Sequence, residues 1–214
     1  LPISWPILVL RRHGSWMASQ YRRVTKNGLG LTFDELVDVA HNQGRWDKKV
    51  LDFYPKIKKL EASFSHKPLV LFYDELKNAP HSFMGKIARF MGTTYNPNKV
   101  SLTSKHTSYN EKQLKLIRHV AMKTFRNWEK PDSQEARNRQ RRFRKFLSHL
   151  VMYAYWLVPE GEWSRAPLIE PGKVERIDEL YAKDWKLCQE YARLNPLESL
   201  LHTHNQPKTH HAQM

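Results

Sequence analysis

An arginine and a serine stand at positions where they could hold a phosphate group. Arg11 directly follows the short apolar run 7–10, which is typical of a buried strand, and Ser19 lies eight residues further on in a helical stretch. A guanidinium at the end of a strand and a hydroxyl in the next helix can grip one phosphate, the arginine through two charge-assisted hydrogen bonds. The start of that helix adds backbone N–H groups and a positive dipole end. The alternative is a solvated strand end followed by an ordinary helix residue.

Tyr73 ends a second apolar run, 69–73, and could lie beside the same ligand. Parallel strands place their carboxyl ends at one edge of the sheet, where open α/β folds bind ligands. An aromatic ring there can stack on a base while its hydroxyl finds a polar partner. The alternative is a core tyrosine that caps the sheet. Asp74 and Glu75 follow directly, and we interpret them as residues that organise the strand–helix turn rather than as an acid–base pair.

The order of elements along the chain predicts an α/β fold. Between the two strands the pattern is helical: Thr32 and Glu35 form a capping-box pattern, and Pro55 is expected to kink or divide a helix over 46–60. An amphipathic helix follows the second strand and stops at Gly92. This alternation is typical of a parallel sheet with helical crossovers. Further helices are expected over 111–126, 133–157 and 173–194.

The same pattern predicts the domain organisation. We expect a single domain over residues 1–195, with an α/β portion over 1–95 and a helical portion over 110–195. Residues 196–214 show no periodicity, and we expect a disordered tail there. The longest apolar stretch, 150–158, is far shorter than the ~20 residues that a membrane span requires, so no span is expected in this chain.

Composition points to an anionic partner. Lys and Arg number 36 against 21 Asp and Glu, which gives a net charge of +15 and a pI near 9.9. Nucleic acid, a phosphate-rich cofactor, an acidic glycan and a membrane surface would all suit this charge, and so would a basic surface that serves solubility alone. The one cysteine, Cys188, excludes an intrachain disulfide and a paired-cysteine metal site. It slightly favours the cytoplasm, and a luminal, Golgi-type location would need an anchor upstream of Leu1.

Five short segments resemble, in order, those of the PAPS-dependent sulfotransferases, where PAPS is 3′-phosphoadenosine 5′-phosphosulfate. The first is the strand ending in Arg11, with Ser19 eight residues later and an aromatic residue, Tyr21, soon after. The others are Thr-Phe-Asp-Glu-Leu at 32–36, Gly-Arg-Trp-Asp-Lys-Lys-Val at 44–50, Leu-Phe-Tyr-Asp-Glu-Leu at 71–76 and Lys-Ile-Ala-Arg-Phe-Met-Gly at 86–92. Together they cover roughly residues 5–95, which is under half of the chain.

The segments also depart from the family pattern at a few positions. Arg12 and His13 stand where Asn or Asp and Pro are usual, which makes the turn after the first strand atypical. Lys49 replaces the usual His, and the two acids at 74 and 75 are exchanged.

The resemblance implies a P-loop-type parallel sheet with helical crossovers, a sulfotransferase-like fold, and a helical C-terminal region. It implies that Arg11 and Ser19 bind the 3′-phosphate of PAPS and that Tyr73 lies near its adenine. The implied reaction moves a sulfuryl group to a hydroxyl or amine of a small-molecule or carbohydrate acceptor, an anionic one included, without a metal. It assigns no catalytic residue here, and the family's later Arg-Lys-Gly element has only weak counterparts in Lys105 and Arg126.

The loop that holds the sulfuryl end of PAPS in this family has no counterpart in the sequence. Neither a Gly-x-x-x-x-Gly-Lys pattern nor a relative of it occurs in the 214 residues, and the usual catalytic His or acid is missing with it. We expect both to precede Leu1, so that this chain is a C-terminal part that cannot transfer sulfate alone.

Two other interpretations stay open. The basic run 137–145, with aromatic residues elsewhere, could serve a nucleic-acid-binding protein. However, its basic positions 137, 141, 144 and 145 follow one helix face while nearby apolar residues point elsewhere, which favours a core-packed helix with a basic outer face. That face could also attract an acidic glycan. A non-catalytic nucleotide-binding module is the other interpretation. No nucleic-acid partner is expected, and the oligomeric state stays open.

Overall fold

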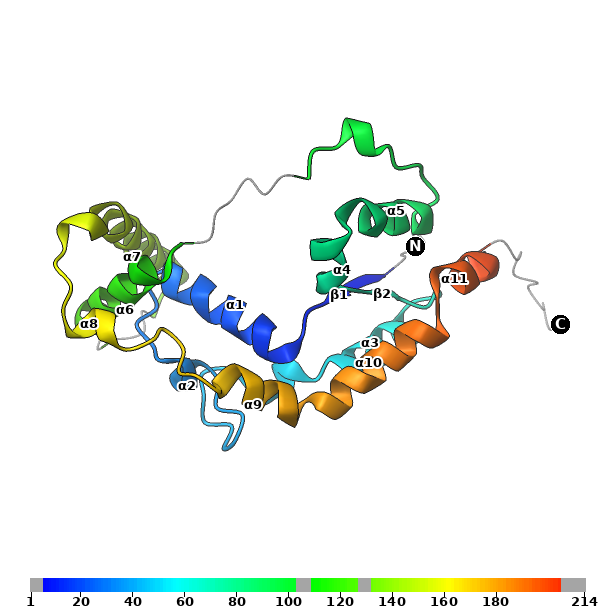
Figure 1. Cartoon of the computed structure of the whole chain (residues 1–214). Helices are drawn as coiled ribbons and strands as arrows, with labels where there is room; N and C mark the ends of the chain where they lie inside the picture. The colour runs from blue at the N-terminus through cyan, green and yellow to red at the C-terminus, as the bar shows by residue number, and fades with distance from the viewer. Residues whose placement is uncertain (1–5, 103–108, 127–131, 205–214) are drawn as a thin grey trace. The chain divides into compact units, whose positions relative to one another are not determined.

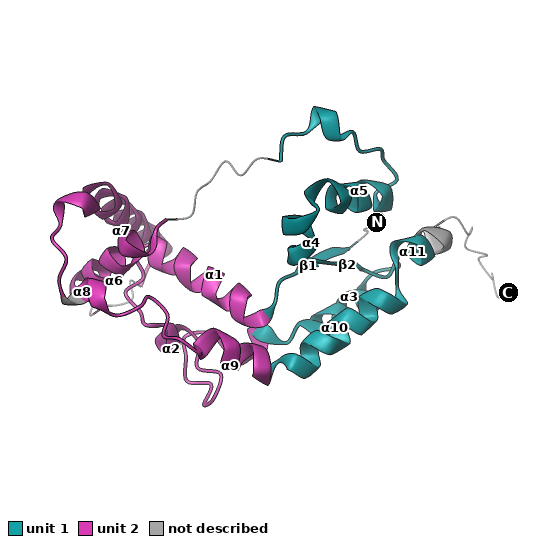
Figure 2. Cartoon of the chain, viewed as in Figure 1, with its two compact units in different colours: residues 1–12, 51–104, 181–214 teal, residues 13–50, 105–180 magenta. Residues whose placement is uncertain are grey.

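The computed structural model describes residues 6–102, 109–126 and 132–204. The chain divides into two compact units, each built from separate stretches of sequence (Figure 2). Unit 1 comprises residues 1–12, 51–104 and 181–214, and unit 2 comprises residues 13–50 and 105–180. The single domain over 1–195 stays a prediction. The two units do not coincide with its sequential portions, because residues distant in sequence pack together in each unit.

Unit 1 is built on two parallel strands, β1 (Ile7–Leu10) and β2 (Leu69–Phe72) (Figure 1). Their register pairs Leu10 with Phe72, and the parallel sheet among helices confirms the predicted α/β class. The first three residues of β2 are buried, as its continuous apolar run predicts. β1 differs, since its Val9 is 44% exposed and, within the described residues, the strand has a neighbour on one side only.

Five helices complete the described part of unit 1. They are α3 (Phe53–Ser63), α4 (Tyr73–Asn78), α5 (Pro80–Phe90), α10 (Ala182–Leu194) and α11 (Leu197–His204), with a 3₁₀ turn, η2, at Pro97–Lys99. One apolar cluster joins the strand to two of these helices, and its buried members are Leu69, Leu71, Phe83, Phe90, Leu197 and Leu200. The burial of these side chains holds β2 against α5 and α11.

The helix predicted over 46–60 is divided, as Pro55 suggested. A 3₁₀ turn, η1 (Lys48–Leu51), precedes α3, and Pro55 lies in the first turn of α3, where its missing N–H removes no helix hydrogen bond. The Phe53 and Tyr54 N–H groups donate to the Asp184 carboxylate at 3.1 and 3.0 Å. This cap comes from α10, a long way off in sequence, which is why the local pattern did not reveal it.

The prediction of a disordered tail from residue 196 is wrong over Leu197–His204, which form α11. Leu197 and Leu200 are buried in the cluster with α5. A segment of eight residues has too little local periodicity to predict a helix, and its order comes from this long-range apolar contact.

Unit 2 is entirely helical in the part that the structure describes. Its helices are α1 (His13–Lys26), α2 (Phe33–Leu36), α6 (Glu111–Phe125), α7 (Gln134–Ala154), α8 (Glu162–Arg165) and α9 (Lys173–Leu180), with a 3₁₀ turn, η3, at Tyr155–Leu157. The predicted capping box opens α2: Thr32 Oγ1 accepts from the Glu35 N–H at 3.2 Å, and Glu35 Oε2 accepts from the Thr32 N–H at 2.7 Å. This prediction is confirmed.

Tyr21 lies at the centre of unit 2. Its side chain is fully buried, its ring meets Phe33 edge-on at 5.3 Å, and its hydroxyl donates to the Leu31 carbonyl at 2.9 Å. Arg118 on α6 donates to the Leu168 carbonyl at 2.9 Å and also approaches the Tyr21 hydroxyl. The aromatic residue that follows Ser19 in sequence is therefore part of the core of unit 2.

The first turn of α1 packs tightly against α9. A Cβ on Gly14 would lie 2.2 Å from the Val174 carbonyl oxygen, so only glycine fits without a backbone shift. The Gly14 N–H donates to Asp178 Oδ1 at 2.8 Å, which places a carboxylate at the positive end of the α1 dipole.

The substitution Gly14→Ala should lower the free energy of unfolding by about 1–3 kcal/mol, because the new methyl group forces α1 and α9 apart. Gly85→Ala is the matched control, since its Cβ would meet nothing nearer than a Tyr95 ring carbon at 3.9 Å and alanine favours a helix by up to about 1 kcal/mol. Denaturant unfolding followed by circular dichroism measures both. Equal stability of the two variants would show that α9 does not pack on Gly14.

Candidate functional site

The structure brings two of the three predicted site residues together at the carboxyl edge of the sheet. Arg11 follows Leu10 and Tyr73 follows Phe72, the pair that ends the parallel register. The Arg11 guanidinium carbon lies 4.8 Å from the centroid of the Tyr73 ring. Both side chains are half-buried, and Tyr73 is the first residue of α4. A cation and an aromatic ring are thus presented side by side.

The contact between Arg11 and Tyr73 is weak enough for a ligand to replace. A cation over an aromatic ring is worth about 0.5–1 kcal/mol at a partly exposed site. A charge-assisted hydrogen bond, by contrast, is worth about 1.5–3 kcal/mol, and an arginine can make two of them to one oxyanion. Two such bonds from Arg11 to a phosphate at this edge would therefore outweigh its contact with the Tyr73 ring.

The strand end is supported from α10 and α5. Phe72 meets Trp185 edge-on at 5.1 Å, which fixes the last residue of β2 against α10. Glu75, in the first turn of α4, forms an ion pair with Lys86 on α5. This pairing is consistent with our interpretation that the acids after Tyr73 organise the turn, and acids in a first helical turn also suit the helix dipole.

Ser19, the third predicted site residue, belongs to unit 2. Its side chain is half-buried on α1. Ser19 lies six residues after the first residue of α1, which corresponds to about 9 Å along the helix axis from the helix start. Its pairing with Arg11 stays a prediction, because Arg11 belongs to unit 1. At the start of α1 one backbone N–H is already engaged, since Gly14 donates to Asp178 Oδ1.

The sequence offered two weak candidates, Lys105 and Arg126, for the Arg-Lys-Gly element of the sulfotransferase pattern. Lys105 lies outside the described residues. Arg126 forms an ion pair with Glu35 at 2.9 Å in unit 2, so its charge is already matched.

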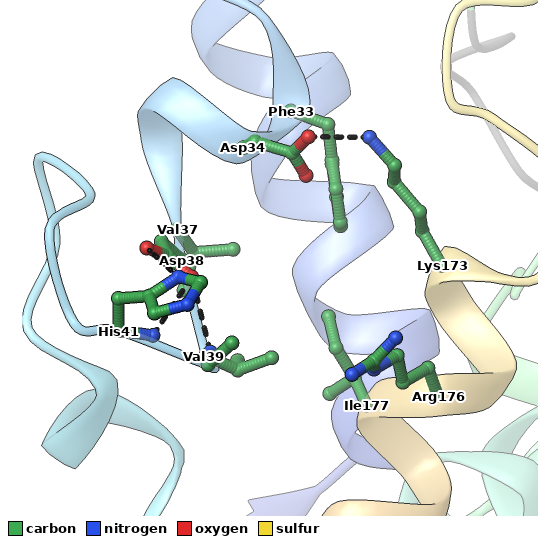
Figure 3. A pocket seen from close by; sticks show the side chains of 10 residues that line it. Phe33, Asp34, Val37, Asp38, Val39, His41, Lys173, Arg176 and Ile177 are labelled. Carbon is green, nitrogen blue, oxygen red and sulfur yellow. Dashed lines mark hydrogen bonds and ion pairs between the residues drawn. The ribbon is translucent and has the colours of Figure 1, made fainter.

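Unit 2 contains a pocket of about 410 Å³ between α2, the loop that follows it and α9 (Figure 3). Apolar side chains form part of its wall, and Asp34 of α2 forms an ion pair with Lys173 of α9. In the loop, the Asp38 carboxylate accepts the N–H groups of Ala40 and His41 at 3.0 Å each, and the His41 Nδ1 lies 3.2 Å from Asp38 Oδ2.

The pair of Asp38 and His41 was missed from the sequence, although the Asp-x-x-His spacing could have indicated it. An aspartate that orients a histidine is a common arrangement for a general base. Here the backbone N–H of His41 lowers the pKa of Asp38 most, and further hydrogen bonds and the His41 charge act in the same direction. The carboxylate therefore holds the loop turn, while the His41 side chain is 75% exposed. This geometry identifies a turn and does not by itself assign a catalytic base.

Two general features of the described ranges bear on function. Among residues 6–102, 109–126 and 132–204, no three His, Cys, Asp or Glu side chains are grouped as metal ligands would be. None of the described helices combines the length and apolar composition that a bilayer crossing requires.

A family model described as "Sulfotransferase domain" matches residues 13–149, which is more than half of the chain. The chain belongs to the sulfotransferase family. The matched range includes Ser19 and Tyr73, begins two residues after Arg11 and ends within α7. Neither the curated proteins nor the solved structures that we compared gave a match to the chain. Family membership makes sulfuryl transfer the general activity of this fold, and it confirms the sulfotransferase-like α/β architecture predicted from the sequence.

The surroundings of Cys188 disfavour the reactive thiolate in this sulfotransferase. Burial raises the pKa of its thiol to about 12, and the nearby Asp184 charge and hydrogen bond act in the same direction. The Sγ lies 3.8 Å from Asp184 Oδ2, and the side chain is fully buried. A group whose pKa is raised stays protonated well above neutral pH, so the reactive thiolate is scarce.

At pH 8 roughly one thiol in 10,000 should be ionised, because that pH lies about four units below the raised pKa. Native protein should therefore take up almost no iodoacetamide at pH 8, and the same protein in guanidinium chloride should take up one equivalent. The single cysteine makes mass spectrometry an unambiguous readout. Labelling of the native protein at the rate of a free thiol would contradict this environment for Cys188.

Proposed function

We propose that this chain holds the nucleotide end of PAPS during sulfuryl transfer, with Arg11 and Ser19 on the 3′-phosphate and Tyr73 beside the adenine. The observation that carries the proposal is the Arg11 guanidinium over the Tyr73 ring at the carboxyl end of two parallel strands. Open α/β sheets bind ligands at this edge, and a cation next to an aromatic ring matches a phosphate next to a base.

The reaction proposed is in-line transfer of the sulfuryl group to an acceptor hydroxyl or amine. Cations near the donor stabilise the negative charge that builds on the departing phosphate, and a base takes the proton of the acceptor. Positioning of donor and acceptor provides much of the rate enhancement in such a transfer. The residues proposed here serve the binding and positioning of the donor, and no residue of this chain is proposed as the base or as the contact to the sulfuryl end.

The alternative functions are supported less well. A nucleic-acid-binding protein would explain the net charge of +15, but it would not explain the match to a sulfotransferase domain. A nucleotide-binding module without catalysis would use the same contacts of Arg11 and Tyr73, and it would differ only in lacking transfer activity.

Binding of 3′,5′-ADP tests the proposal, because this nucleotide carries the 3′-phosphate while 5′-AMP lacks it. Isothermal titration of this chain should show that 3′,5′-ADP binds more tightly. Arg11→Ala should weaken 3′,5′-ADP binding about 10- to 150-fold, the loss expected for about 1.5–3 kcal/mol of charged hydrogen bonding, and should barely change 5′-AMP binding.

The matched control is Arg12→Ala, which removes the same charge from the next residue, an exposed one. It should change 3′,5′-ADP affinity by less than threefold. Equal binding of the two nucleotides by the unmodified chain, or equal losses in the Arg11 and Arg12 variants, would remove Arg11 from the 3′-phosphate site.

A double-mutant cycle tests whether Ser19 holds the same phosphate as Arg11. Ser19→Ala alone should weaken 3′,5′-ADP binding by about 1 kcal/mol, and its effect should shrink by at least about 0.5 kcal/mol when Arg11 is already alanine. With 5′-AMP the same cycle should show no coupling. Fully additive losses with 3′,5′-ADP would mean that the two side chains act on different groups, or that Ser19 acts on none.

A further inference from the structure

Unit 2 contains a second pocket that differs in character from the one beside α9. It is a groove of about 410 Å³, and its lining residues are Arg45, Gln134, Arg137, Asn138, Gln140, Arg141 and Arg144. Four of the seven are arginines, three are amides, and none is an acid. Its volume falls in the range of ordinary ligand pockets, about 300–1,000 Å³.

The arginines converge from two elements that are far apart in sequence. Arg137, Arg141 and Arg144 are four and three residues apart on α7, a spacing that places them on one helix face. Arg45 comes from the loop after α2, where its backbone N–H donates to the Glu35 carbonyl at 2.9 Å. The next residue is held in the same way, since the Trp46 N–H donates to the Leu36 carbonyl at 2.9 Å. The loop thus presents Arg45 to α7 from a fixed backbone.

The part of α7 at one end of the groove is partly buried in unit 2. Ser148, one turn after Arg144, is buried, and its hydroxyl donates to the Arg144 carbonyl at 2.8 Å. Arg144 is itself half-buried. Burial lowers its pKa most, and the positive charges of Arg45 and Arg141 lower it further. These guanidinium groups therefore repel one another.

Several other basic side chains of the protein form ion pairs with acids. Arg126 pairs with Glu35, Lys173 with Asp34, Lys86 with Glu75, and Lys112 with Glu160. The groove instead gathers four arginines around one volume that no carboxylate lines. An oxyanion in that volume would offset the repulsion and accept bidentate hydrogen bonds from the planar guanidinium groups.

We propose that this groove binds an acidic glycan through its sulfate or carboxylate groups. The lining chemistry favours a glycan over a nucleic acid, because no aromatic side chain lines the groove to stack on bases. The three amides offer both donors and acceptors, which suit the hydroxyl groups of sugar rings. This inference rests on the proposed function in one respect, since it names the class of acceptor that a sulfotransferase would hold there.

The test measures binding of a fluorescent heparin-type octasaccharide to this chain without any donor. The groove variant is the double substitution Arg45→Gln and Arg141→Gln. The matched control is Arg139→Gln and Arg142→Gln, which removes two exposed arginines of the same helix that do not line the groove. All four side chains are exposed, and circular dichroism confirms folding of each variant. We expect the groove variant to lose at least 10-fold in affinity and the control less than twofold.

Two outcomes would overturn the proposal. Equal losses in the two variants would show a general basic surface, and tighter binding of an oligo(dT) of equal charge, lost in the groove variant, would show a nucleic-acid site. An uncharged dextran of the same length should not bind. Affinity for 3′,5′-ADP, measured in the same variants, separates this inference from the proposed function. If the groove variant loses glycan binding and keeps 3′,5′-ADP binding, the result supports the groove. If the unmodified chain binds the glycan but not 3′,5′-ADP, the result supports the groove and refutes the proposed donor site.

Discussion

The parallel pairing of β1 with β2 is the constraint on which the candidate donor site depends. Because Leu10 pairs with Phe72, the residues that follow them leave the sheet at one edge, and the Arg11 guanidinium comes to lie over the Tyr73 ring. A slip of one residue would turn the side chains of one strand to the other face and separate this pair. The register is held by apolar burial against α5 and α11, so the geometry of a polar site depends on hydrophobic contacts that contain no site residue.

Unit 2 shows how the same chain uses its charges in two ways. At the start of α1 and along α2 and α9, acids meet cations or helix N–H groups: Asp178 accepts from Gly14, and Asp34 pairs with Lys173. These contacts stabilise the packing of short helices that would be marginal alone. On α7 the balance is different, because Arg141 and Arg144 face Arg45 with no acid lining the volume between them. Such an arrangement is more easily understood as a binding surface than as a means of stabilising the fold.

Membership of the sulfotransferase family gives these two features a common context. Sulfuryl transfer brings together a donor rich in phosphate and an acceptor, and both can be anionic. A net charge of +15 therefore does not by itself indicate a nucleic-acid partner. The transfer step itself needs a base and a contact to the sulfuryl end, and the residues described here account for neither.

The sequence by itself determined those features of the protein that short local patterns encode. Two continuous apolar runs predicted the strands, Thr32 and Glu35 predicted a capping box, and Pro55 predicted a break in the helical segment 46–60. The positions of Arg11 and Tyr73 after the strands predicted the edge at which they meet. Only the tertiary structure decided the contacts between distant segments.

These contacts include the cap of α3 by Asp184, the hydrogen bond from Gly14 of α1 to Asp178, the packing of α11 on α5, and the approach of Arg45 to α7. The physical reason is the distance in sequence over which each interaction acts. Hydrophobic periodicity and capping act over a few residues and are visible in a window of sequence, whereas a carboxylate or guanidinium that comes from 92 to 164 residues away leaves no local signal.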